Sequence, residues 1–352
     1  MKATQILRAI VAIAVLALVA ASTSCSDLRD FSPGATLTAE HVKSPAENIE
    51  YRADERLFTL LVGFSSVGFR DVPRNRIVEE HFSKLSTCVG CEQLSSYLDS
   101  HRLHPCYYIK YILSLSEPPV FEEKQVTKPL LPELSLAGFN TILAQFYRDA
   151  DIHSLWLQFQ GRHEEEIRRL QDIVPPALTG VNQFLGIDAP PGKIIVIPGL
   201  LHWGGYGMVI ADAGYLIIGS PYSDFATRRL VEHEYIHIVI NPILGENEGL
   251  VYESGKAFYG VIASQAEESL SPDEIAFLWE HILKETFARV LTLHLHDPST
   301  DKLRRELAAL EEEGHFLAGE INDCIENFEV GRQTIEEFIP ECLSSIGNSK
   351  EN

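Results

Sequence analysis

The chain has 352 residues, of which 45% are hydrophobic and 22% are charged, and its formal net charge is −21 at pH 7. This acidic excess argues against nucleic-acid binding, because phosphate backbones are bound through surplus lysine and arginine. It also argues against docking on anionic lipid through a basic patch. The length is enough for one large domain or two smaller ones.

The N-terminal segment, residues 1–25, is typical of a bacterial export signal. Lys2 and Arg8 supply positive charge, and the apolar run that follows is too short to span a bilayer comfortably. Cys25 follows small residues, as in a lipoprotein processing site, although Ser22 stands where leucine is usual. We therefore expect an exported periplasmic, outer-membrane or cell-surface lipoprotein, attached to the membrane only through a lipid on Cys25. Ordinary signal-peptidase cleavage is the alternative.

After the signal, the sequence divides into three regions. Residues 26–50 are polar and rich in small residues, as expected of a tether. Residues 51–190 have mainly helical patterns, whereas residues 191–345 contain strands followed by helices. We expect an α+β fold, mostly helical, with a small mixed or antiparallel sheet that precedes one helix of particular interest.

The first elements are assigned from hydrophobic patterns. Residues 57–63 form a short apolar run, which predicts a strand. Residues 78–103 predict helices. His101 and His104 are close enough in sequence to share a metal ion, but Pro105 follows and no carboxylate is near, so we expect a structural role for both.

The next stretch is again helical. Residues 134–174 predict two or three helices, and their aromatic stripe indicates core rather than a ligand site. The run from His163 to Glu166 is expected on a solvated face. The proline pairs at 175–176 and 190–191 are expected to interrupt regular structure.

The chain contains six cysteines. Those after the signal are Cys88, Cys91, Cys106, Cys324 and Cys342. Export favours disulfides, so we expect Cys324 to pair with Cys342 and one bridge to form among the other three. The C-x-x-C spacing of Cys88 and Cys91 also occurs in redox sites, but no thioredoxin-like pattern surrounds it here.

β-Branched runs at 194–197 and 215–218 predict strands, and the glycine-containing segment 202–210 between them predicts a third. Gly204 and Gly205 at its start are compatible either with a β-turn or with close approach of a substrate backbone to a strand edge. The predicted sheet therefore comes directly before residue 223, where the helical pattern resumes.

The window from Ser223 to Asn241 predicts a helix, with Pro242 as a stop signal. It contains His233, Glu234 and His237 in the arrangement H-E-x-x-H. Histidines four positions apart lie on one helix face and can bind one Zn²⁺, while the glutamate can take a proton from a metal-held water. Two ordinary buried histidines are the alternative interpretation.

A catalytic zinc site has three protein ligands and an open position. Two glutamates compete for the third place. Glu285 lies in a strongly apolar helix, where an acid is expensive to bury unless it is paired or bound to metal. Glu253 lies closer to the motif in sequence. We favour Glu285, with Glu253 or another side chain as alternatives.

Four segments resemble an uncharacterised family of exported bacterial proteins similar to the gluzincin peptidases. They are LPELSLAGFNTILAQFY, WGGYGMVIADAGYLIIGSP, VEHEYIHIVINPIL and HILKETFARVL. The likeness covers residues 55–345 and implies a zincin-like fold and a zinc site. The run KETFA also resembles the Asn-Glu-x-Phe-Ala element of aminopeptidase-N-like gluzincins, with Lys284 in place of the asparagine. The family brings no established substrate.

These patterns predict a zinc metallopeptidase whose substrate is a peptide or protein. Zn²⁺ would be held by His233, His237 and Glu285, with Glu234 as general base. The tetrahedral intermediate needs a further donor. The candidates are Tyr206, Tyr252, His281, Arg289 and His294, of which Arg289 could instead orient Glu285. The alternative function is a catalytically silent, zinc-stabilised exported binding lipoprotein.

Overall fold

The computed structural model describes residues 48–69, 75–85, 88–101, 103–123, 136–187, 192–219, 223–265, 271–296, 300–328 and 333–348. The expected export signal, most of the tether and Cys25 lie outside the described residues. Among the helices in these ranges, none combines the length and the apolar character that a membrane crossing requires.

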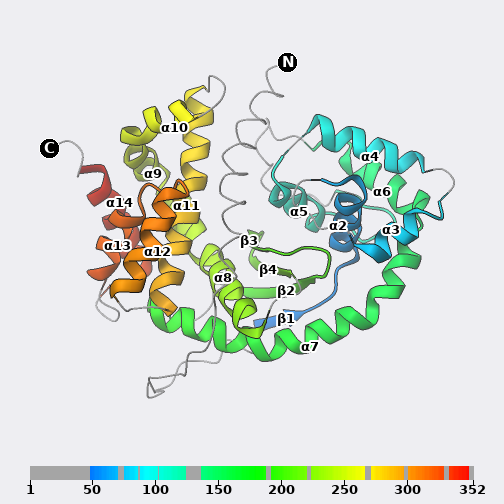
Figure 1. The fold of residues 1–352 in the computed structure, drawn as a ribbon, viewed down its shortest axis with the longest axis horizontal. Coiled ribbons are helices and arrows are strands. Elements are labelled where there is room, and N and C mark those ends of the chain that lie inside the picture. The colour runs from blue at the N-terminus through cyan, green and yellow to red at the C-terminus, as the bar shows by residue number, and fades with distance from the viewer. Residues whose placement is uncertain are drawn as a thin grey trace. The chain divides into compact units, whose positions relative to one another are not determined.

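The protein is mostly helical with one small mixed sheet, so the expected α+β class is confirmed (Figure 1). The sheet has the order β1-β2-β4-β3. Its strands are β1 (Ile49–Tyr51), β2 (Lys193–Gly199), β3 (Gly205–Ile210) and β4 (Ala213–Gly219). β2 runs parallel to β1 and β4, whereas β3 runs antiparallel to β4. The three strands predicted between residues 194 and 218 are therefore present.

Two compact units share the chain. The first comprises Asn48–Leu178 and Pro191–Ile238, and the second comprises Thr179–Pro190 and Val239–Asn352. The first contains the sheet and the helices α2 (Glu55–Val67), α3 (Arg76–Phe82), α4 (Val89–Ser100), α5 (Pro105–Leu113) and α6 (Phe139–Asp149). Two helices continue across the division, α7 (Ile152–Leu185) and α8 (Asp224–Glu246).

The two central strands of the sheet, β2 and β4, are buried on both faces within the first unit. Ile195 of β2 and Ile217 of β4 belong to the hydrophobic core formed with helices α2 and α4 to α7. Ile194, on the opposite face of β2, is also fully buried. On that face α8 lies close to the sheet, because a Cβ on Gly214 would be 2.9 Å from a methyl group of Ile238. Burial on both faces explains the continuous β-branched runs in the sequence.

Residues 57–63 form part of α2, so the predicted strand is wrong. Asp54 caps this helix by accepting bonds from the backbone N–H groups of Arg56 and Leu57, and Gly68 ends it in the left-handed conformation. The helix is buried all round between residues 56 and 65. It therefore lacks the polar face by which a helix is distinguished from a buried strand.

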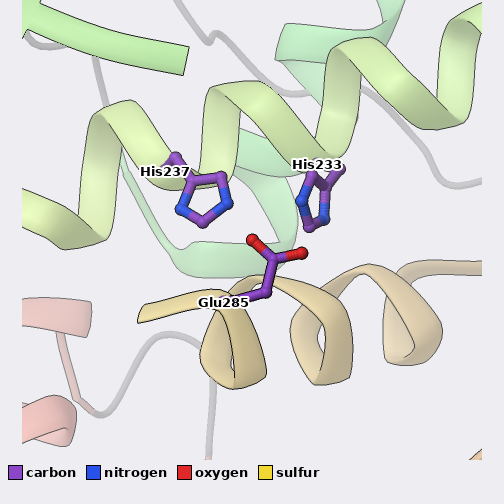
Figure 2. A group of neighbouring side chains, drawn as sticks. All are labelled: His233, His237 and Glu285. Carbon is purple, nitrogen blue, oxygen red and sulfur yellow. The ribbon is translucent and has the colours of Figure 1, made fainter. Parts of the chain in front are cut away.

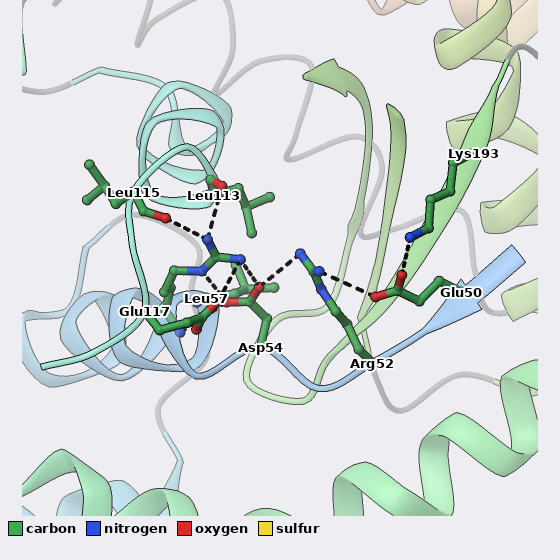
Figure 3. Close-up of polar contacts among 9 residues, drawn as sticks. Glu50, Arg52, Asp54, Leu57, Leu113, Leu115, Glu117 and Lys193 are labelled. Carbon is green, nitrogen blue, oxygen red and sulfur yellow. Dashed lines mark hydrogen bonds and ion pairs between the residues drawn. The ribbon is translucent and has the colours of Figure 1, made fainter. Parts of the chain in front are cut away.

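A buried ion network fixes the start of α2 (Figure 3). Arg56, with a side chain only 2% exposed, pairs with Asp54 and donates to the carbonyls of Leu113 at 3.2 Å and Leu115 at 2.7 Å. Arg52 extends the network from Asp54 toward β1. Since every charge in the network has an opposite partner, the desolvation of Arg56 is offset by ionic and backbone bonds.

Three of the prolines predicted to interrupt or end helices do not do so, whereas Pro190 and Pro191 lie outside the described residues. Pro175 and Pro176 lie inside α7, and Pro242 lies inside α8. Each lacks the N–H that would bond to the carbonyl four residues earlier, at a cost of about 3 kcal/mol. Beyond Pro242, Ile243 and Leu244 are buried, so apolar packing of the following turn favours continuing the helix. Residues 136–174 do form two helices, as expected.

The segment 163–166 is only partly solvated, contrary to expectation. His163 is 3% exposed and Glu166 is 8% exposed, while Glu164 and Glu165 face solvent. The ring of His163 packs against Phe58 and Trp156, and neither of its nitrogens has a hydrogen-bond partner among the described residues. Its position on α7, rather than the charge of its neighbours, decides its burial.

The cysteines follow the prediction in part. Cys88 and Cys91 form a disulfide at the start of α4, which is the one bridge expected among the first three. Cys324 and Cys342 are thiols rather than a disulfide, contrary to expectation. They lie close together, with the sulfur of Cys324 4.0 Å from the carbonyl oxygen of Cys342. His101 stacks on Tyr97, and His104 caps α5, so both have the expected structural roles.

The second unit is built around α11 (Pro272–His296). Its other elements are α9 (Glu248–Gly255), the 3₁₀ turn η3 (Lys256–Phe258), α10 (Tyr259–Gln265), α12 (Thr300–Glu312), α13 (Ala318–Glu326) and α14 (Ile335–Asn348). Trp279 of α11 is fully buried, stacks on Phe258 and donates to the carbonyl of Val251 at 2.7 Å. Trp279 thereby joins the first half of α11 to η3 and α9.

Candidate metal centre

The two histidines of the motif lie one turn apart on α8. Ser223 starts this helix, because its carbonyl accepts from the N–H of Thr227 at 2.8 Å. The helix runs one turn beyond the predicted end, to Glu246. His233 and His237 are partly exposed, and their rings are perpendicular with centroids 4.8 Å apart. Helical spacing therefore brings both imidazoles to one face, as the sequence predicts.

Glu285 of α11 completes a group of three. One ligand atom each from His233, His237 and Glu285 lies within 4.8 Å of the others. Figure 2 shows the carboxylate of Glu285 pointing toward the two rings. Its side chain is 25% exposed. It is the only group of three or more potential ligand residues of this kind among the described parts of the chain.

The donor set fits a divalent cation. Ligand atoms at about 2.0–2.2 Å from one ion cannot lie more than about 4.4 Å apart. The separations here are within 4.8 Å, so small side-chain rotations would satisfy that limit. Two imidazoles and one carboxylate are ligands that zinc and other first-row metals accept, whereas Mg²⁺ and Ca²⁺ prefer oxygen alone. The residues can therefore bind a metal ion.

Glu253, the competing ligand, lies elsewhere. Its side chain on α9 is 61% exposed and forms an ion pair with Lys256 at 2.6 Å. It is not part of the group with His233 and His237. Of the two glutamates weighed in the sequence, the geometry selects Glu285.

Arg289 orients this ligand from one turn further along α11. Its Nε donates to Glu285 at 2.8 Å, and its Nη1 donates to Glu313 at 3.0 Å. Burial acts to lower the pKa of Arg289, but the charges of Glu285 and Glu313 outweigh it and the pKa is raised. A charged group that hydrogen-bonds to a ligand carboxylate limits the rotation of that carboxylate and lowers its basicity. Glu313 was not predicted, because only the fold brings it to Arg289.

Glu234 points away from solvent toward β3. It is 7% exposed, and its Oε2 accepts from the backbone N–H of Gly207 at 2.6 Å. In the pairing of β3 with β4, the carbonyl of Gly204 accepts from the N–H of Gly219. Antiparallel alternation then turns the N–H groups of Gly205 and Gly207 away from β4. The carboxylate of Glu234 thus lies at the outer edge of β3, the end strand in the described sheet.

Two glycines allow this close approach. A Cβ on Gly205 would lie 2.6 Å from the Cγ of Glu234, and a Cβ on Gly207 would overlap its backbone carbonyl oxygen. Because side chains alternate along a strand, both positions face α8. From the sequence, close approach of a substrate backbone is one interpretation of Gly205, but packing of α8 against Gly205 and Gly207 is not predicted. The Gly-x-Gly spacing inside a predicted strand was the available signal.

Tyr206 lies between these glycines and faces the opposite side of the sheet. It packs against the core of the first unit, and its hydroxyl lies 3.0 Å from Nε2 of His202. Nδ1 of His202 accepts from the N–H of Gly204 at 2.8 Å. A neutral His202 therefore carries its proton on Nε2 and donates to Tyr206. This placement favours a structural role for Tyr206 over the oxyanion role considered from the sequence.

The remaining oxyanion candidates have separate surroundings. Tyr252 is 46% exposed. His281 is exposed on α11. His294 lies 2.9 Å from the side-chain oxygen of Asn322. None of the three belongs to the group formed by the potential metal ligands.

No family model, curated protein or solved structure compared with the chain matches it. The chemistry of the site is therefore argued from its residues and geometry.

Proposed function

We propose that the protein is a zinc-dependent hydrolase of peptide bonds. The observation that carries the proposal is the convergence of His233, His237 and Glu285 within 4.8 Å, with the acid Glu234 adjacent in sequence to the first ligand. Two nitrogens and one oxygen are the donor set of catalytic zinc sites that use two histidines and a glutamate. The resemblance to gluzincin-like proteins supports the same assignment.

The ligands and the base would divide the chemistry as follows. When bound, Zn²⁺ would supply Lewis acidity that polarises the substrate carbonyl and acidifies a water molecule. His233, His237 and Glu285 hold the ion, and Arg289 fixes the orientation of Glu285. Glu234 accepts the proton of the attacking water and then donates it to the leaving amine. The reaction consumes one amide and one water and releases a carboxylic acid and an amine.

The edge of β3 offers a place for an extended substrate. Backbone groups of Gly205 and Val209 point away from β4, as alternation requires. A peptide that pairs with such an edge forms main-chain hydrogen bonds without regard to its sequence. It would lie beside Glu234, which already binds the N–H of Gly207. The proposed substrate is thus an extended peptide or unfolded protein segment.

The proposed site of action is outside the cytoplasm. The N-terminal pattern supports an exported lipoprotein, with Cys25 as the lipidated residue. Labelling of cells with a radioactive fatty acid, comparing the natural chain with a Cys25→Ala variant, measures this directly. Equal labelling of the two chains would contradict lipidation at this cysteine.

A silent binding protein with a structural zinc is the alternative function. The hydrogen bond from Gly207 to Glu234 favours this alternative, because the bond gives the carboxylate a structural role that requires no catalysis. The test must therefore remove basicity without removing the hydrogen-bond acceptor. Glutamine does so, since its amide oxygen can still accept from Gly207.

The variant Glu234→Gln is compared with the control Glu246→Gln, which changes an exposed residue on the same helix. Hydrolysis of fluorescein-labelled casein by the zinc-loaded protein should fall about 10²- to 10⁴-fold in the first variant, because a general base is lost. The second variant should retain full activity. Bound zinc, measured by elemental analysis, should be unchanged in both.

Two further results separate the functions. Glu285→Ala should lose zinc, whereas Glu253→Ala should retain it. If Glu234→Gln cleaves casein as fast as the natural chain, the proposed mechanism is wrong. If zinc is bound but no variant or natural protein cleaves casein or a mixed peptide library, the binding function is supported instead.

A further inference from the structure

One tryptophan is exposed beside the proposed active site. Trp203 is 59% exposed, whereas Trp156 and Trp279 are 9% and 0% exposed. An isolated exposed aromatic side chain is ordinary on a protein surface and carries no inference by itself. The surroundings of Trp203 supply the further observations.

The loop that carries Trp203 is held by hydrogen bonds on both sides of it. The N–H of His202 donates to the carbonyl of Gly199 at 2.9 Å, and the N–H of Gly204 donates to Nδ1 of His202 at 2.8 Å. The carbonyl of Gly204 accepts from Gly219 at 2.9 Å. Tyr206 anchors the other nitrogen of His202. The indole is thus presented from a fixed backbone rather than from a loose loop.

These bonds also satisfy three polar backbone groups of the loop. The backbone N–H groups of His202 and Gly204 and the carbonyl of Gly204 are already used within the protein. A partner that binds at this loop would meet the exposed indole of Trp203. Indole faces stack favourably on aromatic and large aliphatic side chains.

The position of the loop ties this face to Glu234. Trp203 is two residues before Gly205, where a Cβ would lie 2.6 Å from the Cγ of Glu234. Two residues of chain span at most about 7 Å. A peptide that lies along the outer edge of β3 beside Gly205 therefore passes within about that distance of the backbone of Trp203.

We propose that Trp203 is a specificity-determining residue, which receives a large apolar or aromatic side chain of the peptide substrate close to the scissile bond. The proposal rests on the proposed function for the location of that bond. It goes further by naming the substrate class, namely peptides with a bulky apolar residue near the cleaved position. Peptides with only small polar residues there should bind weakly.

The test measures binding in the zinc-loaded Glu234→Gln protein, which should not cleave its ligand. Two blocked, dye-labelled hexapeptides serve as probes, differing only in phenylalanine or serine at the central position and containing no tryptophan. Fluorescence anisotropy gives both Kd values. We expect the phenylalanine peptide to bind at least about tenfold more tightly, or about 1.4 kcal/mol.

Adding Trp203→Ala should reduce the affinity for the phenylalanine peptide to that for the serine peptide. Phe225→Ala is the matched control, since this side chain is also exposed, at 51%, and lies away from the loop in sequence. It should leave both affinities unchanged. With an unlabelled phenylalanine peptide, the tryptophan emission should shift to shorter wavelength, and Trp203→Phe should abolish that shift.

The outcomes separate this proposal from the function on which it rests. Equal affinity for the two peptides, binding unaffected by Trp203→Ala, or binding to neither peptide would overturn it. Selective binding without any cleavage by the natural chain would support the role of Trp203 in binding and contradict the peptidase. Cleavage with unchanged site preference in Trp203→Ala would contradict only the role of Trp203.

Discussion

Glu234 has an observed hydrogen bond, with Gly207, and a proposed role, as the general base. Its carboxylate follows a potential metal ligand in sequence and accepts the N–H of Gly207 at 2.6 Å. The bond fixes one oxygen of the carboxylate at the edge of β3. Preorganisation of a base in this way lowers the reorganisation needed in the transition state. The contact exists only because Gly205 and Gly207 have no Cβ.

The substitution Gly207→Ala should lower both the stability of the fold and the rate of casein hydrolysis. The added methyl group would overlap the backbone of Glu234 and push α8 from β3. We expect a loss of about 1–3 kcal/mol in the free energy of unfolding, as for overpacked sites, and at least a tenfold loss of casein hydrolysis. Urea denaturation and the casein assay measure both. Gly245→Ala on α8, with open space at its Cβ, should be neutral or stabilising. Unchanged stability in Gly207→Ala would contradict the account.

The sequence predicts the residues of the motif but not the groups that bond to them. His233, Glu234 and His237 follow from spacing on one helix. Glu285 is favoured because an acid in an apolar helix requires a partner. The bond to Gly207 uses a backbone group, which no side-chain pattern records. Glu313 is brought to Arg289 by the packing of the second unit, so its role depends on the fold.

Individual elements show where local patterns mislead. The segment 57–63 has the composition of a strand but lies in α2, whose signals are Asp54 at the start and Gly68 at the end. A helix buried all round loses the periodicity that identifies it. Pro242 lies inside α8, because the apolar side chains after it are buried. In each case tertiary packing outweighs local propensity.

His163 on α7 should make the free energy of unfolding depend on pH. Burial lowers its pKa from 6.5 to about 4, so the unfolded chain takes up a proton at higher pH than the folded chain. The contribution of neutral His163 to the free energy of unfolding is therefore fully present above pH 6.5, and it decreases as the pH falls toward 4. Between pH 7 and pH 5 this amounts to about 2 kcal/mol of the free energy of unfolding.

His163→Phe removes this titration while keeping an aromatic ring beside Phe58 and Trp156. Urea denaturation of metal-free natural and variant proteins at pH 7 and pH 5 gives the comparison. The natural chain should lose about 2 kcal/mol more than the variant on acidification. All other titrating groups are common to the two proteins and cancel. Equal losses would show that His163 is not held neutral in the fold.

For the whole molecule, the fold class follows from the order of patterns. Strands at 193–219 precede the motif helix, and helices dominate the remainder, as predicted. The pairing of the cysteines does not follow, because pairing depends on which thiols the fold brings together and on the redox environment. Cys324 and Cys342 are adjacent yet unbridged. The zincin-like character and the identity of the metal remain proposals.

The proposed chemistry requires that one cation is bound by two imidazoles from α8 and a carboxylate from α11. X-ray absorption at the zinc edge of the purified zinc-loaded protein, together with elemental analysis, tests it most directly. We predict about one zinc per chain, with nitrogen and oxygen neighbours at about 2.0–2.2 Å and scattering from two imidazoles. Glu285→Ala should weaken zinc binding, whereas Glu253→Ala should not. Substoichiometric zinc, or sulfur neighbours at about 2.3 Å, would contradict the account.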